Sequence, residues 1–390
     1  MRKIFVLYTL ITILLTACNS PIPKTENVIN RVTPSPLPTS TSKPTQTLTP
    51  TPTYTPTITF TPIGGGSGKI VFVSDKDGDS EIYVMNSDGS QQTRLTDNSY
   101  SDDSPQWSSD GKKIVFISDR VKSQSFFFSE IYIMDADGSN QVRITNKGSY
   151  RWTPSAPQWS PDGKKILFYV SEFDQKLDKS ISEIYTIDID GAELTRLTFH
   201  SLDAIDPKWS PDGNMIVYSL HDYGVGNIYV VNTDGTSDTR LTFNHRYNID
   251  PEWSPDGKKI IYMSEYTNTV YDLYAINIDG TDEKQITRDA DANWLPKWSP
   301  DGSKIAYFYN DGISDNICLV DVDSRESKCF VNAGDDAYPE WSPDSRKILF
   351  KSSNEGRRDI YTMDVDGNNI FRLTEENNNG FGFGEYQWQP

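Results

Sequence analysis

Short apolar runs separated by polar turn sequences occupy the chain from Lys69 to its C-terminus. KIVFVSD at 69–75 and EIYVMNSDG at 81–89 are typical, because each is rich in β-branched or aromatic residues and ends at Asp, Asn or Gly. Such runs predict short strands. They are nearly continuously apolar, so both faces of each sheet are expected to be buried. The pattern therefore predicts an all-β fold of small stacked sheets.

These strands belong to a repeat that is marked by tryptophan. Neighbouring members of the series lie 43 to 52 residues apart, and most fall in variants of WSPDGKK. The series consists of Trp107, Trp159, Trp209, Trp253, Trp298, Trp341 and Trp388. Runs like KIVF, EIYVM and TRLT recur with each tryptophan. Because these motifs return from unit to unit, they indicate a scaffold, and function must lie in what does not repeat.

Each unit predicts four strands: PxW forms strand A, KIxF strand B, IYxM strand C and RLT strand D. SPDG and DxDG have the composition of tight hairpin turns and are expected to join A to B and C to D. A single such sheet cannot bury both faces, so the units must close into a ring. The first unit begins at strand B with Lys69, and the last strand A contains Trp388. The sequence thus predicts a seven-bladed β-propeller of four-stranded antiparallel blades with one-plus-three closure, spanning residues 68–390.

The N-terminal residues have a different composition. Residues 1–18 combine a basic start, a short apolar run and the sequence LTAC, which resembles the lipobox of bacterial lipoproteins and predicts lipidation of Cys18. An ordinary secretory signal is the alternative. Residues 19–67 form a Thr/Pro/Ser-rich segment that cannot bury a core and is typical of a disordered linker. We therefore expect an exported protein that is lipid-anchored to the bacterial cell membrane, faces outward and contacts the bilayer only through its acyl anchor.

The repeat PxWSPDGKKIxF, followed by SEIYVM, DG and RLT, resembles the TolB-type, WD-like propeller repeat over essentially all of 69–390. The resemblance implies the propeller fold. TolB itself has six blades and an additional N-terminal α/β domain, so its role with the Pal lipoprotein is not transferred to this chain. The same repeat also forms the propellers of prolyl oligopeptidase-like enzymes and of oligogalacturonate lyases.

Charge and motifs narrow the possible functions. The formal net charge is −18, and no cluster of lysine and arginine is present, which argues against nucleic acid as a partner. The sequence contains no nucleophile elbow, phosphate loop, HExxH or CxxC pair. The chain leaves no room after Pro390 for a hydrolase domain, so we expect no complete peptidase.

The loops that join B to C and D to the next A vary in length and chemistry, whereas the A–B and C–D turns are short and uniform. We therefore expect the functional face to be the one that bears the B–C and D–A loops. Its candidate ligand-binding residues are Tyr100, Tyr150, Trp152, Tyr247, Trp294, Tyr338, Asp206, Asp250 and Asp336. The aromatic residues are expected either to stack on sugars and anchor a protein, or to fill gaps between blades. The carboxylates either bind a cation or basic ligand, or cap turns just before strand A.

Two metal hypotheses arise from residue types. His200, His221 and His245 surround the fourth unit and suggest a transition-metal site. The resemblance to oligogalacturonate lyases, which use a His-ligated manganese, points the same way, although separate histidines are the favoured alternative. Four carboxylates in a B–C loop, Asp75, Asp77, Asp79 and Glu81, suggest calcium, although a plain hairpin is favoured. We expect no cofactor.

Two cysteines replace repeat residues in the sixth unit. Cys318 takes the usual tyrosine position of strand C, and Cys329 takes a leucine position of strand D after a turn that is one residue shorter. Counting outward from Asp323 and Ser324 places the two cysteines opposite each other, within disulfide range. Export favours such a bond. The alternative is a pair of buried thiols.

These observations predict a non-catalytic binding or scaffold module. Its partner would be an envelope or extracellular protein, or a polysaccharide, bound on the face of the B–C and D–A loops by a monomer. The alternatives are a metal-dependent polysaccharide lyase of the oligogalacturonate-lyase type and a purely structural assembly module.

Overall fold

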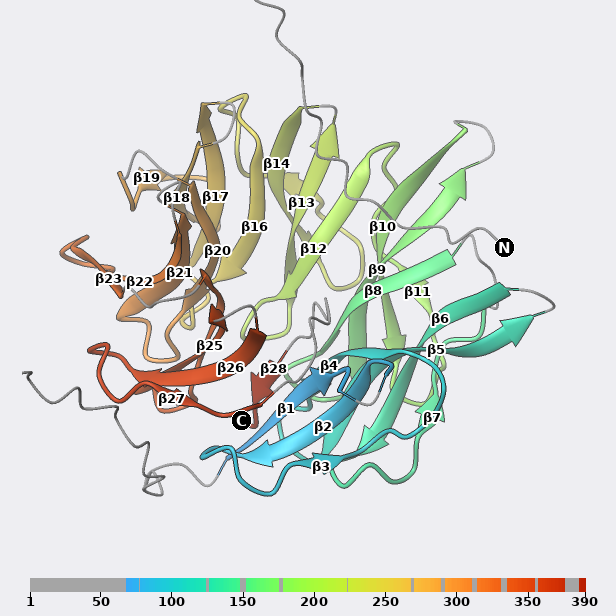
Figure 1. Ribbon diagram of the computed structural model, residues 1–390. Helices are drawn as coiled ribbons and strands as arrows, with labels where there is room; N and C mark the ends of the chain where they lie inside the picture. The colour runs from blue at the N-terminus through green and yellow to red at the C-terminus, as the bar shows by residue number, and fades with distance from the viewer. Residues whose placement is uncertain are drawn as a thin grey trace, which may run out of the picture. The chain divides into compact units, whose positions relative to one another are not determined.

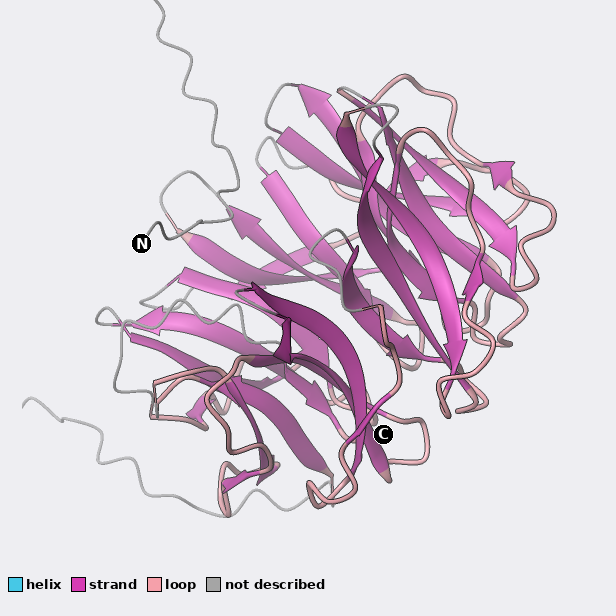
Figure 2. Ribbon diagram, turned by 90° about the vertical axis from the view of Figure 1, so that its right-hand side faces the viewer, coloured by secondary structure: helices cyan, strands magenta, loops and turns pink. Residues whose placement is uncertain are grey.

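The computed structural model describes residues 68–76, 78–123, 126–147, 152–174, 178–222, 224–267, 270–288, 292–310, 314–330, 335–354, 357–375 and 386–390. These ranges contain 28 strands and no helix (Figures 1 and 2). Over the same ranges, no segment forms a helix of the length and apolarity needed to cross a bilayer. Cys18 and the whole of 19–67 lie outside the described residues.

The strands form seven sheets of four, which we number as blades 1 to 7. Blade 1 contains β1 (Lys69–Ser74), β2 (Glu81–Asn86), β3 (Thr93–Arg94) and the C-terminal β28 (Tyr386–Trp388). Blade 2 contains β4 (Asp102–Trp107), β5 (Lys113–Ser123), β6 (Phe126–Asp135) and β7 (Val142–Arg143). Blade 3 contains β8 (Trp152–Trp159), β9 (Lys165–Asp174), β10 (Lys179–Asp188) and β11 (Thr195–Arg196). Blade 4 contains β12 (Asp203–Trp209), β13 (Met215–Asp222), β14 (Val225–Asn232) and β15 (Thr239–Arg240).

The remaining blades have the same order. Blade 5 contains β16 (Asn248–Trp253), β17 (Lys259–Thr267), β18 (Val270–Asn277) and β19 (Lys284–Gln285). Blade 6 contains β20 (Ala292–Trp298), β21 (Lys304–Asn310), β22 (Asp315–Asp321) and β23 (Ser327–Phe330). Blade 7 contains β24 (Asp335–Trp341), β25 (Lys347–Asn354), β26 (Arg357–Asp364) and β27 (Phe371–Arg372). The blades follow one another around a ring in chain order (Figure 1).

Closure of the ring joins the two ends of the propeller. Strand β28 pairs antiparallel with β1, and Ile70 lies opposite Trp388. The C-terminal strand therefore becomes strand A of blade 1, whose other three strands begin the propeller. The predicted seven-bladed fold and its one-plus-three closure are both confirmed.

The A–B turn shows why the SPDG sequence recurs. In blade 3 the Ser160 hydroxyl donates a hydrogen bond of 2.7 Å to Asp162 and accepts one of 2.9 Å from the Lys165 amide. The bond from Ser160 lowers the pKa of the Asp162 carboxyl, so it stays ionised. Gly163 has φ 70°, in the left-handed region where a side chain is strained. The geometry of the turn therefore explains why serine, aspartate and glycine recur at these positions.

The hydrophobic core lies between blades. One cluster joins Val115 and Ile131 of blade 2 to Trp159 and Phe168 of blade 3. The indole nitrogen of Trp159 donates to the Gln106 carbonyl of blade 2 at 3.1 Å. Each blade thus presents apolar surface to both neighbours, which explains why its strands are apolar on both faces.

Strand A is longer than the PxW sequence suggests. In blades 2 to 7 it begins at least five residues before the tryptophan and contains a β-bulge. The residue three positions before the tryptophan has a φ between 49° and 59° in all six of these blades. Asp206 and Asp250 occupy this bulge position, so the expectation that they precede strand A is wrong. The extra residue of a bulge changes the direction of the side chains beside it.

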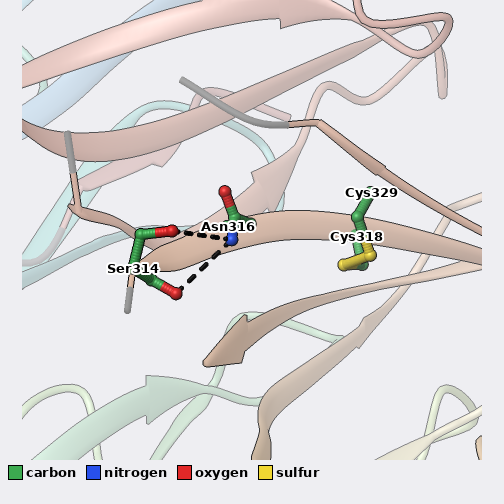
Figure 3. Close-up of a disulfide and its surroundings, with 4 residues drawn as sticks. All are labelled: Ser314, Asn316, Cys318 and Cys329. Carbon is green, nitrogen blue, oxygen red and sulfur yellow. Dashed lines mark hydrogen bonds between the residues drawn. A yellow bond between two sulfur atoms is a disulfide. The ribbon is translucent and has the colours of Figure 1, made fainter. Parts of the chain in front are cut away.

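Blade 6 carries a disulfide between Cys318 and Cys329, whose Cα atoms are 4.0 Å apart (Figure 3). The register pairs Cys318 with Cys329 as it pairs Tyr83 with Arg94 in blade 1, and each pair is 11 residues apart. Cys329 therefore occupies the arginine position, and the expected leucine position and shorter turn are both wrong.

The disulfide stands where blades 1, 3 and 7 have an ion pair. In blade 1, Arg94 contacts the buried carboxylate of Glu81 at 2.6 Å. In blade 6 the equivalent of Glu81 is Asn316, whose amide donates to the carbonyl and hydroxyl oxygens of Ser314 (Figure 3). A covalent link thus ties strand D to strand C where the electrostatic link is lost.

Candidate functional site

The edge of blade 4 that carries the B–C loop is held closely against blade 5. Asp203, His221 and Gly226 lie side by side on strands A, B and C. A Cβ atom on Gly226 would lie 2.6 Å from the Asn248 carbonyl oxygen, so only glycine allows this approach. The Asn248 amide donates to the Gly226 carbonyl at 3.0 Å, and Gly226 forms a parallel bridge with Tyr247. Gly226, the second glycine of HDYGVG, therefore positions Tyr247 over blade 4.

Tyr247 contacts His221. Its hydroxyl lies 3.0 Å from Nδ1 of His221, and the ring centroids are 4.9 Å apart. Burial lowers the pKa of His221, opposed by the negative charges of Asp206 and Asp203, so the imidazole is neutral at pH 7. Burial also raises the pKa of Tyr247, which keeps its hydroxyl protonated and able to donate to Nδ1.

The bond to Tyr247 uses one of the two ring nitrogens of His221. The hydroxyl donates to Nδ1 in one tautomer of the ring and accepts from it in the other. Nε2 is buried and makes no hydrogen bond to any residue that the structure describes. His221 is therefore a neutral imidazole with one ring nitrogen whose hydrogen-bonding capacity is not used within the described part of the propeller.

Asp206 and Asp250 form a carboxyl pair between the innermost strands of blades 4 and 5. Burial, and then the charge of Asp206 and a hydrogen bond to it, raise the pKa of Asp250 to about 7, against the opposing effects of Lys208 and Lys297. Two carboxyl groups this close cannot both ionise readily, so the pair shares a proton near neutral pH. A ligand cation would replace that proton.

A row of aromatic rings continues from blade 5 to blade 7. Trp294 lies 4.8 Å from Tyr271 and 6.4 Å from Phe308, measured between ring centroids. Phe308 lies 6.2 Å from Tyr338, whose side chain is 46% exposed. Burial, and then the charge of Glu265, raise the pKa of Tyr271 to about 12. Trp294 is half-buried in this row, while Tyr338 is open to a ligand.

The other candidate binding residues have different environments. Trp152 is 5% exposed and packs edge-on against Phe168 at 6.0 Å, so it fills the gap between blades and is not on a binding rim. Tyr100 is half-buried in a D–A loop. Asp336 lies in β24 opposite Ser352, and Tyr150 lies outside the described residues.

The three histidines do not meet. Nε2 of His200 contacts Asp238 at 2.9 Å and the Tyr218 hydroxyl at 3.0 Å, whereas His221 contacts Tyr247. His245 is exposed. Across the described ranges, no three His, Cys, Asp or Glu side chains are grouped so that they could hold a metal ion. The hypothesis that these three histidines together bind a transition metal is therefore wrong, because each imidazole has separate surroundings.

The calcium hypothesis fails at Glu81. This side chain is fully buried and is committed to Arg94 at 2.6 Å and to the Asn98 amide at 2.8 Å. It is part of the link between strands C and D and is not a loop ligand. Asp75 and Asp79 lie in the B–C hairpin, and Asp77 is outside the described residues.

A cavity of about 340 Å³ lies at the opposite end of the propeller, among the A–B turns. Its polar lining includes Gln106, Gln158, Lys208, Glu252 and Gln387. These residues each precede the repeated tryptophan. In the sequence, the residue before the tryptophan varies from blade to blade, which indicates a surface that is not pure scaffold. The turns beside it are uniform, so the sequence predicted the functional face at the opposite end.

Two exposed phenylalanines were also missed. Phe199 and Phe243 are 75% and 68% exposed and follow strand D of blades 3 and 4. The guanidinium groups of Arg196 and Arg240 lie 4.9 and 4.8 Å from their ring centroids. The signal for them is that TRLT is followed by phenylalanine only in these two units.

Comparison with known proteins identifies the family. The family described as the TolB beta propeller domain matches residues 46–176, 151–270 and 264–384. This chain belongs to the TolB β-propeller family. A curated relative, the uncharacterized peptidase YuxL of Bacillus subtilis, is 23% identical over 162 residues, which are 39% of this chain and 20% of that protein. The chain spans less than half the length of the curated relatives it matches.

Solved structures share the fold of this TolB β-propeller. TolB from Acinetobacter baumannii is 18% identical with a TM-score of 0.53, and the match covers 80% of this chain and 79% of that one. An oligogalacturonate lyase from Vibrio parahaemolyticus is 16% identical with a TM-score of 0.64, covering 76% and 86%. At these identities the likeness shows the fold alone.

Proposed function

We propose that this TolB-family propeller is a non-catalytic binding module of the bacterial cell envelope, exported and held at the membrane by a lipidated Cys18. Its ligand, an envelope or extracellular protein or a glycan, binds on the face of the B–C and D–A loops. Family membership supports the envelope location, and the LTAC sequence supports the anchor.

The observation that carries the proposal is the group formed by His221, Tyr247, Asp206 and Asp250. Among blades 2 to 7, only blades 4 and 5 have a carboxyl group at the bulge position. Neither His221 nor Tyr247 recurs in another blade, and both lie at the edge of blade 4 that carries the variable B–C loop. The group combines a neutral imidazole with an unused ring nitrogen, an aromatic ring and a carboxyl pair that shares a proton. Binding sites typically place a few such polar groups beside aromatic surface.

The test is capture of envelope proteins and glycans by the full chain in detergent. We expect a ligand that binds the wild-type chain and is lost when Tyr247 is replaced by Ala. The matched control is Tyr361→Ala in strand C of blade 7, away from this face. A ligand that binds both variants equally would show that the site lies elsewhere on the molecule.

A separate measurement addresses the lyase alternative. A metal-dependent lyase would carry manganese or another transition metal and would cleave oligogalacturonate by elimination. We expect no stoichiometric transition metal in the purified chain and no unsaturated product with added Mn²⁺. Product formation that is lost on replacing His221 by Ala would establish a lyase and refute the binding proposal.

A further inference from the structure

The two exposed phenylalanines mark one sector of the propeller. Phe199 and Phe243 occupy a position that is polar in the other blades where it is described, namely Asp97, Asn146, Arg288 and Glu375. These two side chains are 75% and 68% exposed and lie outside the core clusters between blades, each beside the guanidinium group of Arg196 or Arg240. Together they flank blade 4 at its outer strand, on the face of the D–A loops. Such side chains, when they are not part of a core, are typical anchors for a partner.

The inner end of the same blade is acidic. The charges that act on Tyr247 are those of Asp206, Asp250, Asp203 and Glu265. The nearest cations on the inner strands are Lys208 and Lys297, and Lys297 is 3.6 Å from Glu252. Four carboxyl groups thus face two lysines, and one of these lysines, Lys297, is paired with Glu252. This end of blade 4 is therefore complementary to a positive charge.

The separation of the two features sets the size of a ligand. Strand D of blade 4 is three strand spacings from strand A, or about 14 Å. An extended peptide advances about 3.3–3.6 Å per residue, so roughly four residues cover that distance. Asp206 also lies three residues further along strand A than Asp203, which pairs with His221, so four to five residues of one peptide segment are needed to contact Phe243 and the carboxyl pair together.

We propose that the edge of blade 4 docks an extended segment of a partner protein, with an apolar side chain on Phe243 and a lysine or arginine, about four residues away, at Asp206 and Asp250. This blade-4 docking surface consists of Phe243, Asp206, Asp250, His221 and Tyr247, and Phe199 follows strand D of the preceding blade. The inference rests on the proposed binding function of this face and specifies the partner's chemistry. A neutral glycan would leave the acidic end without a counter-charge.

Binding should depend on pH with a defined sign. Asp250 holds its proton up to about pH 7, and a bound cation expels it, so association releases a proton below that pH. Affinity is therefore expected to rise about tenfold from pH 6 to pH 8. The titratable groups that face the pair are Asp203, His221, Tyr247, Glu265, Lys208 and Lys297. Burial lowers the pKa of His221, and its protonation at low pH would weaken cation binding further.

The experiment uses a displayed library of random heptapeptides selected on the full chain in detergent. We expect the enriched peptides to carry lysine or arginine about four residues from a large apolar residue. An enriched peptide should bind at least tenfold more weakly to the F243S and D250N variants, and the pH dependence should disappear in D250N. The matched control is V142S, which alters a 57% exposed residue at strand D of blade 2 and should bind as the wild type does.

Other results separate the inference from the function on which it rests. Enriched peptides without a cation, or peptides that bind F243S and D250N as tightly as the wild type, would overturn the docking model. Binding of a glycan that is lost with Tyr247→Ala would overturn it while leaving the binding function intact. Melting temperatures of the variants no more than about 2 °C below that of the wild type establish that each one is folded.

Discussion

The carboxyl group of Asp250 lies in a strand bulge beside Asp206 and keeps its proton to about pH 7. Its ordinary pKa is about 4, so the folded chain binds a proton that the unfolded chain releases between about pH 4 and pH 7. The stability that this proton provides is complete below pH 4 and is lost as the pH rises through 7. A functional group of this kind lowers the stability of the protein at the pH where it works.

Replacing Asp250 by Asn should therefore stabilise the protein at high pH. The asparagine side chain keeps the hydrogen bond to Asp206 without a second negative charge, so we expect a gain of about 1–3 kcal/mol at pH 8 and almost none at pH 4. Denaturant unfolding at both pH values measures it. Asp256→Asn in the neighbouring turn is the control, since its carboxyl is ionised throughout and bonded to Ser254. An equal effect of D250N at both pH values would contradict the shared proton.

At this scale the sequence predicts residue types better than environments. It identified Asp206, Asp250 and Tyr247 as candidates because acidic and aromatic residues gather in the sequences that precede the repeated tryptophan. It could not separate Tyr338, which is exposed, from Trp152, which fills a gap between blades. The difference depends on where strand A begins, and the bulge that extends this strand has no signature in a single sequence.

At the scale of one element, blade 6 replaces an ion pair by a disulfide. Strand D has only two residues in the other blades and depends on cross-strand links such as Arg94 to Glu81. In blade 6 it has four residues, and Cys329 is exposed on this edge strand while Cys318 is fully buried. The separation of the cysteines could be counted from the sequence. Counting outward from the turn also placed them opposite each other, as the structure does. The repeat position of Cys329 could not be assigned, because the strand contains no arginine to align.

Loss of the disulfide should weaken blade 6 by a limited amount. Replacing Cys318 and Cys329 together by Ala should cost about 2–3 kcal/mol, the value expected for closing so short a loop. The triple change N316E, C318Y and C329R restores the residues of the other blades and should recover much of that loss through a new ion pair. Thermal unfolding of both variants tests this. Two alkylatable thiols in the unreduced wild-type chain would contradict the disulfide.

At the scale of the whole molecule, the fold could be predicted because each repeat unit contains the sequence pattern of the same four strands. Neither the anchor nor the partner repeats, and each needs its own experiment.

Replacing Cys18 by Ser should abolish fatty-acid labelling and release the chain from membranes into the soluble fraction, since one cysteine carries the proposed acyl group. The control is Cys318→Ser, which should leave labelling unchanged. A C18S chain that stays membrane-bound, beside a wild type that takes up no fatty acid, would refute the anchor.

Closure of the ring gives the strongest test of the architecture. Deleting 386–390 removes β28, exposes the edge of β1 and leaves Ile70 and Phe72 without Trp388. Loss of one buried tryptophan alone costs about 3–5 kcal/mol, which is comparable with the stability of many domains. We expect the truncated chain to lose cooperative unfolding or to associate through the exposed edge, as measured by calorimetry and gel filtration. Removing only Pro390, which follows the strand, should leave both measurements unchanged. A truncated chain that melts like the wild type would show that the strand at the C-terminus does not close the ring.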